Sequence, residues 1–363
     1  MLHKLRITTF VLLFASFTFL LSCTPQPQSP RQITFFVYRF NPPAFVEFSE
    51  DFQQLKEIPF SIPLNCAMFD VFPAPIGRYL LIELSCPNGQ TVLFLDASSS
   101  LSASSGSAMQ PVTDTDSHFL AWASDGKSAY LKVDSLGNAR VVRVETDGSR
   151  KNMDVTGWTY DLASKPDSGD FLFTFSRGLG SGSELNFTQN NGRDAKTLYT
   201  DPFNYISYAR YSPDASQIAF IKTPDSPTPF MVGELWVMDA DGSAPRTLAD
   251  ADAGHGYAAN WSPDGTRIAF VKRENPEDES ANQSSESLVS NIYTVQVGTG
   301  ELTQVTHFTD GRVETPYWSP DGNTLAFNVV LNGRMEVQIA DIDSEQIRLL
   351  IMESTCCPAW MRK

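Results

Sequence analysis

The most regular pattern in the chain is a polar turn set between apolar runs, and it recurs. Its three clearest copies, at 211–220, 261–270 and 318–327, each join an aromatic residue, Ser-Pro-Asp, a short polar stretch and an apolar run. The aromatic anchors lie 50 and 57 residues apart. Serine can bond backbone amides at a turn, proline fixes φ for the next position, and glycine accepts positive φ. The motif therefore predicts a hairpin with a strand on each side.

The strand after each turn is apolar without alternation, as in residues 268–271. A continuous apolar run of this length predicts a strand that is covered on both faces. Two more strand-like segments follow in each repeat, for example 291–297 and 301–306. Four strands in a repeat of 42 to 57 residues predict one blade of a β-propeller.

The number of blades follows from weaker copies of the motif along the rest of the chain. Together with the clear copies they place innermost strands near 68–72, 119–123, 158–163, 207–211, 257–261, 314–318 and 357–361. The last of these has no successor, whereas three strand-like segments at 32–38, 44–48 and 52–58 precede the first. We therefore predict an all-β fold: a single seven-bladed propeller of four-stranded blades, closed by pairing of N- and C-terminal strands. Six blades is the alternative.

The motif also carries a resemblance to a known family. Trp-Ser-Pro-Asp-Gly followed by Ile-Ala-Phe, and then a strand ending in Asp-Ala-Asp-Gly-Ser at 239–243, resembles the TolB-type, WD-like β-propeller repeat. The resemblance covers residues 205–363 well and residues 33–204 only through degenerate copies. It implies a periplasmic propeller that works through protein contacts. TolB itself carries an additional N-terminal α/β domain, so membership in the Tol system does not follow.

The first residues have the pattern of a bacterial lipoprotein signal peptide. Lys4 and Arg6 precede an apolar run at 7–21, and Leu-Leu-Ser-Cys at 20–23 resembles the lipobox. The run is too short for a membrane-spanning helix, which needs roughly 20 apolar residues. We expect a signal peptide at 1–22, lipid attachment at Cys23 within a Pro-rich tether at 23–32, and the propeller at 33–363.

The net charge of the chain limits the classes of partner that it can bind. The chain has a formal charge of -15, and removal of Lys4 and Arg6 with the signal peptide makes it -17. Such an acidic domain is expected to bind neither nucleic acid nor an anionic bilayer surface. We expect an exported monomer, anchored through Cys23 to the cell membrane or outer membrane and facing the periplasm or the exterior.

Four further cysteines can form disulfides in such an oxidising compartment. Cys66 and Cys86 lie ten residues on either side of Ile76, at the centre of a degenerate turn, which favours a bond across the hairpin. Cys356 and Cys357 are adjacent, and a bond between neighbours is strained. For these two we expect free thiols, or pairing with Cys66.

The chain shows no pattern of an enzyme. No Gly-x-Ser-x-Gly is present, and the glycine-rich stretch 178–182 lacks the Lys-Ser/Thr ending of a phosphate loop. The mature chain's histidines, His118, His255 and His307, lie at unequal distances before the aromatic anchors of their blades, which disfavours a shared metal site. We expect no catalytic residue, no metal and no cofactor.

Partner binding is expected on the face that carries the longer loops, because loops on a rigid scaffold often bind ligands. The candidate binding residues are Phe203, Tyr205, Phe230, His255, Tyr257, Phe308 and Arg312. The acidic insertion 273–286 contains no aromatic residue and is expected to be disordered. We expect a non-catalytic envelope scaffold that binds a protein or a glycan. The alternative is a propeller hydrolase or lyase acting on envelope or extracellular polysaccharide, which polar side chains converging on the ring axis would favour.

Overall fold

A computed structural model describes residues 33–60, 62–97, 116–135, 138–155, 158–189, 192–252, 258–344 and 346–362. Contacts group Gln32–Lys363 into one compact unit. The expected signal peptide and tether, including Cys23, lie outside the described residues. Within the described part of the chain, no helix has the length and apolar character needed to cross a bilayer.

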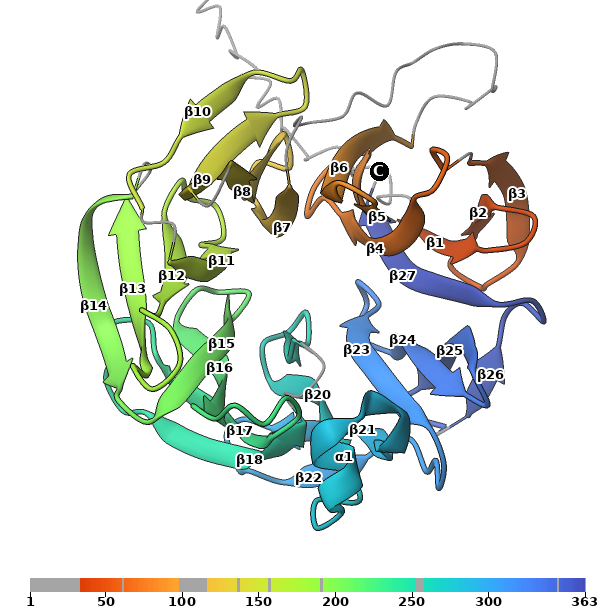
Figure 1. The fold of residues 1–363 in the computed structure, drawn as a ribbon. Helices are drawn as coiled ribbons and strands as arrows, with labels where there is room; N and C mark the ends of the chain where they lie inside the picture. Colours follow the sequence, from red (N-terminus) through yellow and green to blue (C-terminus); the bar gives the residue numbers. More distant parts are fainter. Residues whose placement is uncertain are drawn as a thin grey trace, which may run out of the picture. The chain divides into compact units, whose positions relative to one another are not determined.

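The described strands form seven antiparallel sheets arranged in a ring (Figure 1). From the axis outwards, the first two sheets are β27 (Thr355–Arg362), β1 (Ile33–Arg39), β2 (Ala44–Phe48), β3 (Gln54–Pro59); and β4 (Ala67–Pro73), β5 (Tyr79–Cys86), β6 (Gly89–Asp96). The next two are β7 (Ser117–Trp122), β8 (Ser128–Ser135), β9 (Asn138–Glu145), β10 (Arg150–Asn152); and β11 (Thr159–Ser164), β12 (Phe171–Phe175), β13 (Ser183–Gln189), β14 (Arg193–Asp201). The last three are β15 (Asn204–Tyr211), β16 (Gln217–Pro224), β17 (Val232–Asp239), β18 (Arg246–Asp252); β19 (Asn260–Trp261), β20 (Arg267–Arg273), β21 (Ser290–Gln296), β22 (Leu302–Gln304); and β23 (Arg312–Trp318), β24 (Thr324–Leu331), β25 (Arg334–Asp341), β26 (Ile347–Leu349).

The prediction of a seven-bladed all-β propeller is confirmed, and the six-bladed alternative is wrong. Six sheets have four described strands. The sheet of β4, β5 and β6 has three, and the residues that follow it, 98–115, lie outside the described ranges.

The turn motif forms the hairpin that its chemistry predicts. The backbone amide of Arg267 donates to Ser262 Oγ at 2.9 Å, and the amide of Thr266 donates to Asp264 Oδ1 at 3.0 Å. Gly265 takes a φ of 71°, which closes the turn. The copies at 212–217 and 319–324 make the same serine and aspartate bonds. The turn is therefore built by residues within six positions of each other.

The core lies between neighbouring blades. The run 268–271 is at most 2% exposed, because other blades cover both faces of β20. The tryptophan anchors of the motif also bind across blades: Trp318 Nε1 donates to the carbonyl oxygen of Asn260 at 3.0 Å. Trp122, Trp261 and Trp360 make the same kind of bond. The anchors thus join successive blades as well as filling space.

The ring is closed by the two ends of the described chain. Strand β27 pairs antiparallel with β1, and Ile33 lies opposite Arg362. Inside this pair the rings of Phe35 and Trp360 are 4.4 Å apart. The predicted closure is confirmed, and one sheet is built from both ends of the chain.

The acidic insertion is ordered, so the expectation of disorder is wrong. It contains the short helix α1 (Glu279–Gln283) and the 3-10 turn η1 (Ser285–Ser287). Asp278 caps α1 by accepting from the amide of Ser280, and Ala281 is fully buried. Arg273 holds the insertion to the blade, donating to Asn282 Oδ1 at 2.8 Å. The cap on α1 and the hydrogen bond from Arg273 thus hold this segment in place, although it has no aromatic residue to form a core.

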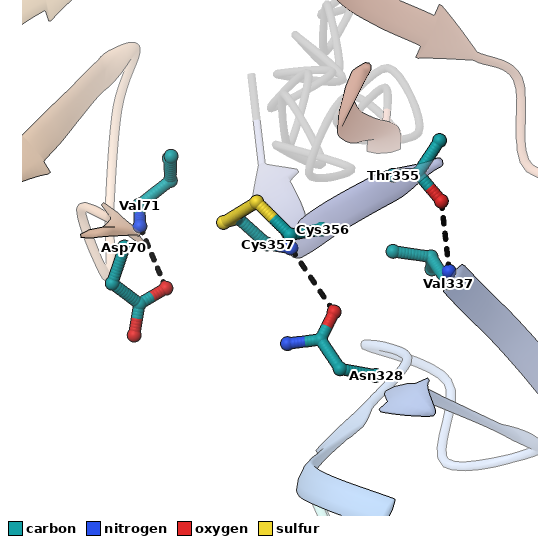
Figure 2. The surroundings of a disulfide bond; sticks show 7 residues. All are labelled: Asp70, Val71, Asn328, Val337, Thr355, Cys356 and Cys357. Carbon is teal, nitrogen blue, oxygen red and sulfur yellow. Dashed lines mark hydrogen bonds between the residues drawn. A yellow bond between two sulfur atoms is a disulfide. The ribbon is translucent and has the colours of Figure 1, made fainter. Parts of the chain in front are cut away.

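The cysteines pair in two ways. The sulfur atoms of Cys66 and Cys86 are joined at 1.99 Å, the pairing that the spacing predicts. The expectation for Cys356 and Cys357 is wrong, since they are joined to each other (Figure 2). Neighbouring strand residues normally point to opposite faces, but β27 has a bulge here, and Cys357 has a φ of 63°.

Candidate functional site

The up-and-down order of strands gives the ring two different faces. Turns between the first and second strands of each sheet, and between the third and fourth, lie on one face. We call this the short-turn face; it carries the Ser-Pro-Asp motifs. The opposite face, the long-loop face, carries the loops between second and third strands and the connections between blades.

The predicted binding residues fall on or near the long-loop face but do not form one surface. Phe203 is exposed, whereas Tyr205 and Phe230 are partly buried. Phe308 is also partly buried, packs against the core beside Trp318, and donates its amide to Asn291 Oδ1 at 2.7 Å. His255 and Tyr257 lie outside the described residues.

The partly buried members have structural partners. The rings of Tyr205 and Tyr160 meet edge to face with their centroids 6.0 Å apart. Arg312 lies 3.3 Å from the carboxylate of Glu314. The amide of Phe230 donates to the carbonyl oxygen of Asn282 in α1. Side-chain contacts therefore engage Tyr205 and Arg312, and a backbone bond holds Phe230, whereas Phe203 is widely exposed.

Six exposed apolar side chains lie on loops of the long-loop face, and we divide them into two groups by the blades that carry these loops. The first, the Trp158 patch, consists of Trp158, Leu179 and Phe203, which are 59%, 61% and 78% exposed. The second, the Met352 patch, consists of Phe40, Leu64 and Met352; Leu64 is 90% exposed. Among the described turns of the short-turn face, Ile76 is the one large exposed apolar side chain. The described loops of the long-loop face therefore carry more of the large exposed apolar side chains than the described short turns do.

The loops of the Trp158 patch are held together by Asp225. Its carboxylate accepts from the amides of Gly180 at 2.9 Å and Gly182 at 2.8 Å, and its own amide donates to the carbonyl oxygen of Phe203. Burial opposes the charged form, but the two glycine amides hold the pKa of Asp225 below its usual value. The amide of Ser176 donates to the carbonyl oxygen of Trp158 at 3.4 Å. The patch is therefore a fixed surface.

In the Met352 patch the loops of Phe40 and Met352 are joined to each other, whereas Leu64 lies on the separate connection between β3 and β4. The amide of Phe40 donates to the carbonyl oxygen of Ser354 at 3.1 Å, two residues from Met352. The guanidinium of Arg334 donates to the carbonyl oxygen of Met352. The segment that carries Leu64 is joined to β5 through Cys66. Backbone bonds and a disulfide thus present these apolar side chains to solvent.

Polar side chains occupy the innermost strands. Asp161 accepts from the amide of Ala209 at 3.1 Å and from Arg210 Nη1 at 3.2 Å, so an ion pair joins β11 to β15. Asp70 stands at the equivalent position of β4, and burial is the largest cause that raises its pKa to about 7. The carboxylates of Glu83 and Glu314 raise it further. Burial and the neighbouring carboxylates therefore favour the protonated form of this acid on an innermost strand.

His118 lies between two carboxylates near the same blade. Its Nδ1 is 3.3 Å from Glu83, and its Nε2 is 3.6 Å from Asp116. The hydrogen bond to Glu83 raises the pKa of His118, against the effect of burial. No group of three or more His, Cys, Asp or Glu within the described residues has metal-binding geometry.

Comparison with known proteins identifies a family that the repeat matches. Residues 215–361 match the family TolB beta propeller domain. The chain is 36% identical over 94 residues to the uncharacterized peptidase YuxL of Bacillus subtilis, an alignment spanning 26% of this chain and 12% of that protein. The chain thus spans about an eighth of that relative's length.

Solved structures agree on the fold. TolB from Acinetobacter baumannii superposes with a TM-score of 0.50 and 17% identity, covering 93% of this chain and 81% of that one. An oligogalacturonate lyase in complex with manganese superposes with a TM-score of 0.59 and 13% identity, covering 88% and 84%. Both a TolB and an enzyme share the architecture, so the fold does not choose between binding and catalysis. The chain is a seven-bladed β-propeller, and its residues 215–361 match the TolB beta propeller domain.

Proposed function

We propose that the protein is an exported, lipid-anchored scaffold of the cell envelope that binds a protein partner through its long-loop face. One observation carries the proposal: the Trp158 and Met352 patches place six large exposed apolar side chains on the loops of a single face. The propeller forms with these side chains exposed, so they do not contribute to its core. Clusters of exposed apolar side chains are typical of interaction sites. The signal-like segment and Cys23 support export and anchoring.

The composition of the patches favours a protein over a glycan. Leu179, Leu64 and Met352 offer aliphatic and thioether surface, which contributes to binding through burial of apolar area. Trp158 and Phe203 are the kind of rigid aromatic side chain that often dominates protein interfaces. Fixed loops reduce the entropy cost of ordering a binding surface.

Site-specific photo-crosslinking in intact cells tests the proposal. A crosslinker at position 203 should capture a defined envelope protein, and one at position 76, on the short-turn face, should not. Adding Trp158→Ala and Leu179→Ala should lower capture at least tenfold. The matched control replaces Leu302 and Ile347, exposed residues of outer strands, and should leave capture unchanged. Equal capture from both faces, or capture that survives the patch substitutions in a folded protein, would refute the proposal.

A polysaccharide hydrolase or lyase is the second candidate, and the polar innermost strands favour it. Asp70, with its pKa raised to about 7, could act as a proton donor at neutral pH. Asp161 is less suitable because Arg210 and a backbone amide already engage its carboxylate. Reducing-end and unsaturated-product assays on envelope polysaccharides decide the matter: activity that is lost in Asp70→Asn, with unchanged melting, would support this candidate over the scaffold.

A further inference from the structure

Strand β4 carries two adjacent side chains that the fold leaves without a structural partner. Phe69 is 58% exposed and belongs to none of the hydrophobic clusters of the described residues. The carboxylate of Asp70 accepts from the amide of Val71 at 2.7 Å (Figure 2), and no other group of the described residues donates to it. An exposed aromatic ring and an acid with one local hydrogen bond therefore follow each other in the sequence.

A bulge in β4 places Phe69 beside the ring axis. The pairing of β4 with β5 shifts between Met68 and Asp70, so Phe69 is the extra residue of the bulge. Bulges turn side chains out of the regular alternation of a strand. Strand β5 pairs with the outer edge of β4, and neighbouring blades cover both faces of this sheet (Figure 1). The open side of this innermost strand is the axial side, so the exposed ring borders the axis.

The same two positions of β11 show what the fold itself requires there. The pairing of β11 with β12 shifts in the same way just before Asp161, and the bulge residue is Tyr160. The hydroxyl of Tyr160 donates to the carbonyl oxygen of Ile206, and Asp161 forms an ion pair with Arg210 at 3.2 Å. Both side chains therefore join β11 to the next blade. The two β4 residues make no such bond.

In the β4 blade another acid makes the bond to the next blade. Glu83 lies opposite Asp70 in the pairing of β4 with β5 and is 3% exposed. Its Oε2 accepts from the amide of Phe119 in β7 at 3.2 Å. Because Glu83 performs the role that Asp161 has in its own blade, the carboxyl group of Asp70 is left available for a ligand.

The groups around Asp70 favour a neutral ligand that is rich in hydroxyl groups. Burial, followed by the carboxylates of Glu83 and Glu314, raises the pKa of Asp70 to about 7, so an anionic ligand would be repelled here and a cation would require the disfavoured charged acid. Burial, and then the charge of Asp70, raises the pKa of Tyr317 in β23, so its phenol stays protonated and can donate. An aromatic ring with a few polar groups beside it suits a ligand that is apolar on one side and polar at its edge. A sugar ring has both surfaces.

We propose that Phe69 and Asp70 form a binding site for one ring of a neutral saccharide on the axial side of β4. The ring of Phe69 packs against the apolar C–H face of the sugar, and Asp70 and Tyr317 bond to its hydroxyl groups. The site includes none of the residues of the Trp158 and Met352 patches. It requires neither the lipid anchor nor a catalytic step.

Calorimetric titration of the full-length protein with trisaccharides tests the site. The neutral probes are cellotriose, laminaritriose and triacetylchitotriose, and the anionic probe is trigalacturonate. We expect a neutral probe to bind, and trigalacturonate to bind about tenfold more weakly or not at all. Phe69→Ala should weaken binding of the neutral probe about tenfold, and Phe69→Trp should retain it. Both variants should melt with the native protein, because the ring is exposed.

Variants of Asp70 separate hydrogen bonding from charge. Asp70→Leu cannot bond to a hydroxyl group and should weaken binding about tenfold, whereas Asp70→Asn keeps a neutral hydrogen-bonding group and should bind within about threefold of the native protein. Phe203→Ala is the matched control, since it removes an exposed aromatic ring of the Trp158 patch and should leave sugar binding unchanged.

Three outcomes would overturn the inference: no binding of any neutral probe, tighter binding of trigalacturonate than of the neutral probes, or native affinity in folded Phe69→Ala. Loss of sugar binding in Phe203→Ala would place the site on the Trp158 patch instead. No partner protein is present in the titration. A failure of this site can therefore be told apart from a failure of partner capture through position 203.

Discussion

The buried ion pair between Arg273 and Asp252 should be a dominant contribution to the order of the long-loop face. Both side chains are 0% exposed, and Arg273 Nη2 lies 2.9 Å from Asp252 Oδ1. The same guanidinium donates to the carbonyl oxygen of Phe230 at 3.1 Å and to Asn282 Oδ1 at 2.8 Å. One side chain thus joins the end of β18, the loop before β17 and helix α1.

Replacement of Arg273 by Met keeps most of the volume but leaves Asp252 as a buried charge without this partner. Removing one member of a buried pair costs about 3–5 kcal/mol in free energy of unfolding. For a propeller of this length that corresponds to a fall in Tm of about 4–7 °C. Helix α1 should also become accessible to protease, because its anchor to the blade is lost.

Calorimetry and limited proteolysis of matched variants check the reasoning. Arg273→Met combined with Asp252→Leu removes both charges and should recover most of the loss, to within about 1 kcal/mol of the native protein. Arg193→Met is the control, since its pair with Asp154 is exposed and should contribute about 0–1 kcal/mol. The proposed role of the Arg273–Asp252 pair is refuted if Arg273→Met has the same Tm as the native protein. It is also refuted if the double variant is less stable than Arg273→Met.

Three further changes test the packing and the pH dependence. Trp318→Phe should lower the free energy of unfolding by about 1–3 kcal/mol in urea, because the carbonyl of Asn260 loses its donor; a native value would contradict the role of the anchor. Gly182→Ala should cost about 2 kcal/mol or more, since φ is 61° and a Cβ would lie 2.2 Å from a backbone carbonyl oxygen; an unchanged Tm would contradict this. The bond to Glu83 raises the pKa of His118, so its stabilisation is complete below the usual value of 6.5 and is lost as pH rises through the folded value. Melting between pH 5 and 9 should show a shallower decline in His118→Gln, and an identical slope would refute the assignment.

The fold was predictable because its signals are local. Ser262 and Asp264 build their turn with residues only two to five positions away, and the run 268–271 shows its burial directly in its composition. Closure of the ring was predictable for another reason: the repeat left one innermost strand and three outer strands unassigned at opposite ends of the sequence.

The order of the insertion was not predictable from composition. Its anchor, Arg273, depends on Asp252, which is 21 residues earlier, and on the carbonyl of Phe230, which is 43 residues earlier. An acidic segment without aromatic residues satisfies the compositional rule for disorder, yet one desolvated guanidinium with three acceptors from separate segments holds it. Such a coincidence of distant partners leaves no local pattern in the sequence.

The proposed patches lie on the face that the loop lengths favoured, but they share only Phe203 with the predicted binding residues. Phe203 and Phe308 are both aromatic residues of loops on that face, yet Phe203 is 78% exposed and Phe308 packs into the core. Trp158 was missed because it was placed in the innermost strand predicted near 158–163, whereas β11 begins at Thr159. Leu64 and Met352 were missed because they lie outside any strand pattern. That property was the available signal: large apolar residues in connections that no periodicity assigns to the core.

The contrast between the two faces also shows which residues carry functional information. Asp264 and its equivalents are conspicuous in the sequence, but each is explained by the turn in which it accepts a backbone hydrogen bond. The side chain of Trp158 is 59% exposed and belongs to none of the hydrophobic clusters of the described residues, so burying it would be favourable. Some exposed apolar residues are not required by the fold, and their contact with water is unfavourable in the unbound protein. Such residues indicate a binding partner. By this criterion we assign the proposed binding surface to the Trp158 and Met352 patches rather than to the repeat motif that identified the fold.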